Sequence, residues 1–170
     1  MGPKKYLHIG ALVIVGWLLG LGHGVLSSMC PSLRLDLLIL AGMAAALAGI
    51  IKGFAALAFD EDRPKSLPLF GALLGAVALM GSWCGWVWEA SQFEHFMLLH
   101  PIDLFQTVWD VASHGEYTVT SRGGSMSTGV AQPSVKWAWI CEAAVLFFTP
   151  LLSAVFWVYE NRDQWTNGEW

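Results

Sequence analysis

Four apolar segments, each long enough to cross a bilayer, constrain this chain more than any other feature of its sequence. They run over Tyr6–Ser27, Leu35–Phe59, Leu67–Trp88 and Val135–Tyr159. A helix needs roughly 20 apolar residues to cross the hydrocarbon. Only 13% of the 170 residues are charged, whereas about a quarter are charged in a typical soluble domain. The sequence therefore predicts an all-α membrane protein, in which four transmembrane helices form a single domain over residues 1–170.

The distribution of lysine and arginine predicts which way the chain crosses the membrane. The first segment follows a basic start, as in a signal peptide, but its apolar run is longer than such a peptide needs, so we expect it to be retained. Six basic residues lie on the side of the termini: Lys4, Lys5, Lys52, Arg63, Lys65 and Arg162. Three lie on the other side: Arg34, Arg122 and Lys136. Because basic loops stay inside, both termini are predicted to be cytoplasmic.

Residues 89–134 form the one sizeable extramembrane piece, a cap on the outer side between the third and fourth segments. The stretch "HPIDLFQTVWDVASHG" predicts a helix that starts at Pro101 and stops at Gly115. One face of this helix is apolar and carries Ile102, Phe105, Val108, Trp109 and Ala112. This pattern predicts a helix that lies along the membrane surface or on the bundle. The following "EYTVTSRGGSMSTG" favours a small hairpin.

Tryptophans gather where the third segment ends and the fourth begins. They are Trp83, Trp86, Trp88, Trp137 and Trp139. Indole side chains are favoured at the membrane interface, which accounts for these positions. A role in binding a cofactor or a carbohydrate is the alternative.

Small residues recur on one face of three of the segments. Gly16, Gly20 and Gly24 follow each other at a spacing of four in the first segment. In the third segment one arc carries Gly71, Gly75, Ala78, Ser82 and Gly85, and Leu74 lies off it. In the second, an alanine face carries Ala41, Ala44, Ala45, Ala48 and Ala55. Transmembrane helices associate through such faces, so we expect packing surfaces, either within the chain or toward a partner membrane protein.

His23 and Glu142 are ionisable residues inside apolar segments. His23 shares the face of Gly16 and Gly20, and Glu142 lies in "WAWICEAAVLFF" at a similar depth. Ionisable groups in the hydrocarbon face the bundle interior and find a partner. We therefore hypothesise that His23 meets Glu142. The pair is either a structural contact, with Glu142 also able to stay neutral, or a site for a proton or ion.

Other site chemistries have weaker support in the residue pattern. A haem needs histidines from two helices at matched depth, which His8 lacks, while His23 with His95 or His100 stays an open pairing. Ligand types for a metal are present in His23, Glu89, Glu94 and His95. No nucleophile lies beside a credible base, so no catalytic residue is predicted. A net charge of -4 without a basic patch argues against nucleic-acid binding.

The last third of the chain resembles a known pattern. "HPIDLFQTVWDVASHGEYTV", followed by a glycine and "WAWICEA", looks like a segment of uncharacterised multi-span bacterial membrane proteins. These share a proline-led outer helix, a glycine-aromatic turn and a span running from Trp to Glu-Ala. The resemblance implies a bacterial inner-membrane setting and supplies no activity.

These features together predict an accessory or assembly subunit that binds other membrane proteins through its helices. One alternative is a small transporter or channel component that uses Glu142 and His23. Another is a membrane redox subunit that holds haem or quinone. Partners are the lipid bilayer and other membrane subunits; no cofactor is predicted.

Overall fold

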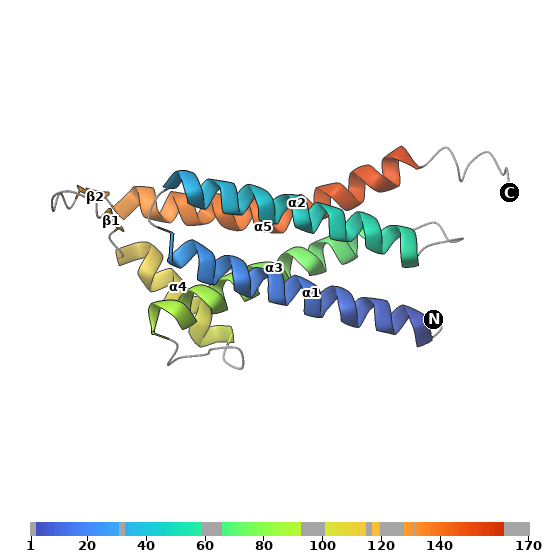
Figure 1. Ribbon diagram of the computed structural model, residues 1–170, viewed down its shortest axis with the longest axis horizontal. Coiled ribbons are helices and arrows are strands. Elements are labelled where there is room, and N and C mark those ends of the chain that lie inside the picture. Colours follow the sequence, from blue (N-terminus) through green and yellow to red (C-terminus); the bar gives the residue numbers. More distant parts are fainter. Residues whose placement is uncertain are drawn as a thin grey trace, which may run out of the picture.

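The computed structural model describes seven stretches of the chain, residues 3–30, 33–58, 66–92, 101–114, 117–119, 128–130 and 132–161. Five helices and two short strands follow in the order α1 (Pro3–Ser28), α2 (Leu33–Ala58), α3 (Leu67–Ala90), α4 (Pro101–His114), β1 (Tyr117–Val119), β2 (Thr128–Val130) and α5 (Gln132–Glu160). In Figure 1, α4 and the strands lie at one end of the bundle, here called the capped end. The start of α1 and the end of α5 lie at the other, here called the terminal end.

Four of the helices are long and apolar enough to cross a membrane. The candidate spans are Tyr6–Ser28, Arg34–Leu57, Leu67–Ala90 and Lys136–Glu160. At about 1.5 Å per residue, each exceeds the roughly 30 Å of hydrocarbon. The predicted fold class, an all-α membrane protein with four spans, is confirmed, and the chain is a multi-pass membrane protein.

Helix α3 is the centre of the bundle. Half of its span is buried (50%), whereas the other three spans bury between 17% and 28%. It packs against α1 along much of its length and against α5 on a neighbouring side. Leu67 and Leu74 of α3 enter an apolar core with Leu12, Leu47 and Leu146 from the other three spanning helices. Small residues are what allow one helix to hold two neighbours this closely.

The three glycines of α1 face α3. A Cβ at Gly20 would overlap the carbonyl oxygen of Ala78, and one at Gly24 would overlap that of Ser82. At Gly16 it would meet Cδ1 of Leu74 at 2.5 Å. The expectation that Leu74 lies off the contact surface is therefore wrong, because its side chain is fully buried against α1. At Gly20 and Gly24 the two backbones touch only because the side chain is a hydrogen atom.

The small-residue arc of α3 is divided between two helices. Gly71 and Gly75 lie against the backbone of α5, with carbonyl oxygens of Pro150 and Phe147 at 2.7 and 2.6 Å from an added Cβ. Gly85 instead lies against Leu21 of α1. Gly81 also contacts α1, through the carbonyl of Trp17 at 2.5 Å. Gly81 lies at the edge of the arc, so helical periodicity does not group it with the other small residues.

Helix α2 does not use its alanines as the sequence suggests. Its core contacts come from larger side chains, namely Met43, Leu47, Ile51 and Phe54. Ala55 is buried, but Ala41 and Ala45 are exposed. The expected alanine face is thus only partly an internal packing surface, and much of it points away from the bundle.

The cap packs on the end of α3. Leu104 and Val108 of α4 are buried against Cys84 and Val87. The apolar face predicted for α4 is therefore split, since Ile102, Phe105 and Trp109 on its flank stay exposed. Strands β1 and β2 pair antiparallel, with Thr118 opposite Gly129, which is the hairpin that the sequence favours.

Several residues used in the sequence analysis lie outside the described residues. They are Phe59, Arg63, Lys65, Glu94, His95, His100, Gly115, Arg122 and Arg162, together with the two adjacent glycines of "EYTVTSRGGSMSTG".

Candidate functional site

His23 is one of two fully buried polar side chains among the described residues, and the other, Ser82, is its nearest polar partner. His23 is 3% exposed and Ser82 2% exposed. Nδ1 of His23 lies 3.0 Å from Oγ of Ser82, which is hydrogen-bond distance. The glycine contacts between α1 and α3 bring these side chains together, since Gly24 beside His23 lies on the backbone of Ser82. Ser82, which the sequence analysis assigned to a packing surface, thus also has a polar role.

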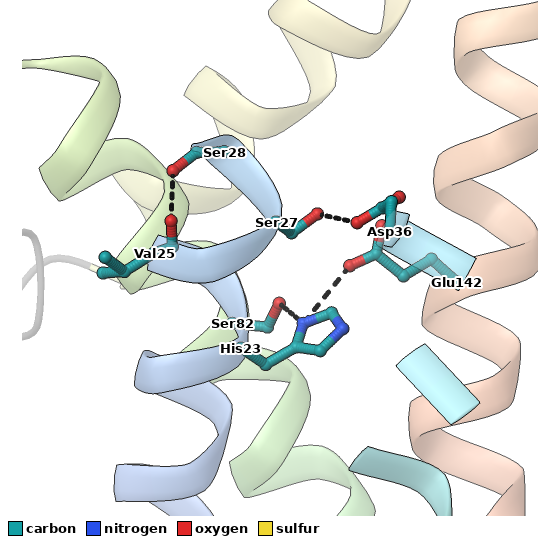
Figure 2. A network of polar contacts seen from close by, with 7 residues as sticks. All are labelled: His23, Val25, Ser27, Ser28, Asp36, Ser82 and Glu142. Carbon is teal, nitrogen blue, oxygen red and sulfur yellow. Dashed lines mark hydrogen bonds and ion pairs between the residues drawn. The ribbon is translucent and has the colours of Figure 1, made fainter. Parts of the chain in front are cut away.

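The structure places Glu142 of α5 on the same histidine nitrogen. Oε1 of Glu142 lies 3.6 Å from Nδ1 of His23 (Figure 2). This distance is too long for a direct hydrogen bond and short enough for an ion pair. The Glu142 side chain is 24% exposed, whereas that of His23 is 1% exposed. The two residues that the sequence singles out therefore lie together, with Ser82 as the closer partner of the ring.

A second polar contact extends the cluster to α2. Oγ of Ser27 donates a hydrogen bond of 2.6 Å to Oδ1 of Asp36, in the first turn of α2. Figure 2 shows this pair beside His23 and Glu142, so four helices meet at one polar cluster near the capped end. Sequence reasoning missed both residues. The available signal was that Ser27 lies four residues after His23, on the same helical face.

The second ring nitrogen of His23, Nε2, takes no part in these contacts. Nε2 is buried and has no hydrogen-bond partner among the described residues. An unsatisfied buried polar group costs about 1–3 kcal/mol. Since Nδ1 lies near both Ser82 and Glu142, it accepts from the Ser82 hydroxyl in one tautomer and donates toward either oxygen in the other. In either tautomer, Nε2 of His23 remains without a hydrogen-bond partner among the described residues.

A small hollow lies next to the cluster, between α1, α3 and α5. Its lining combines three indoles, two hydroxyls and one carboxyl group: Gly24, Ser27, Ser82, Trp83, Trp86, Trp139 and Glu142. Trp86 and Trp139 meet edge to face, with ring centroids 4.9 Å apart. Three of the tryptophans predicted to mark the membrane interface therefore also line this hollow.

The sequence analysis also considered a metal site and a haem site. Among the described residues, no group of three or more His, Cys, Asp or Glu side chains lies close enough to hold a metal ion. His8 and His23 both belong to α1, fifteen residues apart, so they do not face one haem from two helices. The pairings of His23 with His95 or His100, and the metal ligand Glu94, fall outside the described residues.

Comparison with known proteins adds no identity. No protein family, no curated protein and no solved structure matches the chain significantly. The resemblance of the last third of the chain therefore rests on the quoted segments alone.

Proposed function

We propose that this protein is an accessory or assembly subunit of a membrane complex, which binds a partner through the outward face of α2. The observation that carries this proposal is a row of small residues on that face, Gly42, Ala45, Gly49 and Gly53, all exposed. A Cβ at any of the three glycines would meet no atom within 4 Å. The small faces of α1 and α3 are occupied inside the chain, whereas that of α2 is not.

A free small-residue face is informative in a bilayer. Helices gain little there by hiding apolar side chains, so association depends on close backbone approach. Ala45, Gly49 and Gly53 follow at a spacing of four, which places them on one stripe of α2. Another transmembrane helix with small residues of its own is the partner that such a stripe accommodates.

The burial pattern favours a binding role over transport by a single chain. Both fully buried polar side chains among the described residues, His23 and Ser82, lie toward the capped end. Toward the terminal end the buried cluster consists of apolar side chains, Leu12, Ile51 and Leu67 among them, and the buried polar atom described there is Nδ1 of His8, whose side chain is only partly buried. A transport path needs polar groups at more than one depth. The polar cluster therefore serves better as a local site than as part of a conduction path.

Gly49→Leu is expected to release the partner without unfolding the chain. The leucine would stand on the open face of α2, so it blocks close approach of a second helix and clashes with nothing inside. We expect partner retention to weaken about tenfold or more, equivalent to about 1.4 kcal/mol. The measurement is mass spectrometry of the tagged protein purified gently from its native membrane.

Gly10→Leu is the matched control, because Gly10 of α1 also meets no atom within 4 Å. It should keep the partner. Recovery of the chain alone or only with copies of itself would contradict the proposal, as would equal retention by the two variants.

For its setting we propose a bacterial inner membrane with both termini in the cytoplasm. The lysine and arginine distribution supports this orientation, with Lys52 toward the terminal end of α2 and Arg34 and Lys136 toward the capped end. The resemblance of the last third supports the bacterial setting.

Cys30 labelling tests the orientation. Cys30 follows α1 at the capped end, is partly exposed and forms no disulfide with the other described cysteines. A membrane-impermeant maleimide added to intact cells should label it, while Cys84, which is buried, should stay unlabelled. A variant that keeps only Cys30 makes the readout specific, and labelling of denatured protein shows that the thiol is free. Labelling of the native protein only after the cells are opened would reverse the orientation.

A further inference from the structure

We propose that the hollow between α1, α3 and α5 binds a primary ammonium group. Its lining side chains are Ser27, Ser82, Trp83, Trp86, Trp139 and Glu142. The ammonium group would come from an ethanolamine lipid headgroup or from a free small amine. This site lies apart from the outward face of α2, so its failure would leave the proposed function untouched.

The carboxyl groups near the hollow favour a cationic ligand. Glu142 lines the hollow. Figure 2 shows the side chain of Asp36 beside that of Glu142. Among the described residues, Glu142 forms its ion pair with His23. The cluster thus contains two carboxyl groups and one imidazole. Arg34 is exposed and lies two positions before Asp36, which turns it to the opposite side of α2.

The aromatic walls suit the same ligand. Indole is the best ring for a cation–π contact, and a primary ammonium group such as that of lysine is one of the cations that make it. Trp86 and Trp139 are inclined at 77°, so they form two walls that meet near a right angle. The protein already makes one such contact nearby, where Nζ of Lys136 lies 4.3 Å from the ring centre of Trp109.

The oxygen atoms match the donors of a primary ammonium group. Such a group has three N–H donors, and the hollow offers the carboxylate of Glu142 and the hydroxyls of Ser27 and Ser82. Ser27 donates its proton to Asp36, so its oxygen keeps lone pairs for accepting. The narrow space favours –NH₃⁺ over the bulkier trimethylammonium group of choline.

The depth of the hollow agrees with a lipid headgroup. Ser27 is one residue from the end of α1, and Trp86 is four residues from the end of α3. Four residues span about 6 Å of helix. The hollow therefore lies close to the membrane interface, where headgroup ammonium groups are found.

The test is a binding titration of the full chain in detergent, read by native mass spectrometry. Phosphatidylethanolamine is compared with phosphatidylcholine and phosphatidylglycerol of the same acyl chains. In separate titrations, ethanolamine hydrochloride is compared with sodium chloride by calorimetry. We expect phosphatidylethanolamine or ethanolamine to bind about tenfold or more tightly than its comparison compounds. Binding of the lipid alone assigns a headgroup site, whereas binding of free ethanolamine as well assigns a general amine site.

Two variants test the hollow itself. E142Q removes the carboxylate at nearly constant volume, and Trp139→Leu removes one wall. Each should weaken binding about tenfold, and the second decides the matter if the first fails to fold. Trp137→Leu is the control, since Trp137 is 65% exposed and does not line the hollow. Equal binding of all three lipids without ethanolamine binding, no detectable binding, or losses no larger than that of Trp137→Leu would overturn the proposal.

Discussion

Gly20→Leu is expected to separate α1 from α3 and to lower the free energy of unfolding by about 3 kcal/mol or more, the upper part of the range for overpacked interiors. Even the Cβ of the new side chain would overlap the carbonyl group of Ala78. Backbone cannot move aside as a flexible side chain does, so the whole helix must shift. The shift would also pull His23, three residues further on, away from Ser82.

Gly22→Leu is the control for this experiment. Gly22 is exposed on the same helix, and a Cβ there meets no atom within 4 Å. Leucine is the better helix former by somewhat under about 1 kcal/mol, so this variant should be neutral or slightly more stable. Unfolding in mixed micelles with increasing sodium dodecyl sulfate gives the comparison. Equal stability of the Gly20→Leu and Gly22→Leu variants would show that the backbones of α1 and α3 are not in contact.

Ser82→Ala is expected to destabilise the protein by about 1–3 kcal/mol, since it leaves Nδ1 of His23 buried without its nearest partner. A double-mutant cycle separates the two contacts of the ring. We expect a coupling free energy of about 1 kcal/mol between His23→Leu and Ser82→Ala, and a smaller one between His23→Leu and Glu142→Leu. The order follows from the distances of 3.0 and 3.6 Å to Nδ1.

The same unfolding measurement in mixed micelles yields both cycles. A control cycle combines His8→Leu with Ser82→Ala. Because His8 lies fifteen residues from His23 on α1, the effects of these two substitutions should be additive. In the two cycles that include His23, the double variant should lose less unfolding free energy than the sum of the losses of its single variants. Strict additivity of His23 with Ser82 would remove the hydrogen bond from the account of this cluster, and a larger coupling with Glu142 would reverse the proposed order.

The four spans followed from the sequence because the bilayer makes length and hydropathy nearly sufficient. A run of roughly 20 apolar residues must satisfy its backbone internally, so it becomes a helix whatever its neighbours are. The same local chemistry placed the proline-led helix and the hairpin of the cap. The common depth of His23 and Glu142 was also readable, because it depends only on distance along two helices.

Which faces meet was decided by the tertiary structure. Helical periodicity places residues on an arc but does not say how many neighbours share it. On α3 one arc serves α5 through Gly75 and α1 through Gly85, and on α2 the alanine face partly has no neighbour in the chain. The Ser27–Asp36 bond and the nearer partner of His23 likewise depend on side chains from different helices. Contacts of this kind arise from the crossing of helices far apart in sequence, which no pattern within one helix specifies.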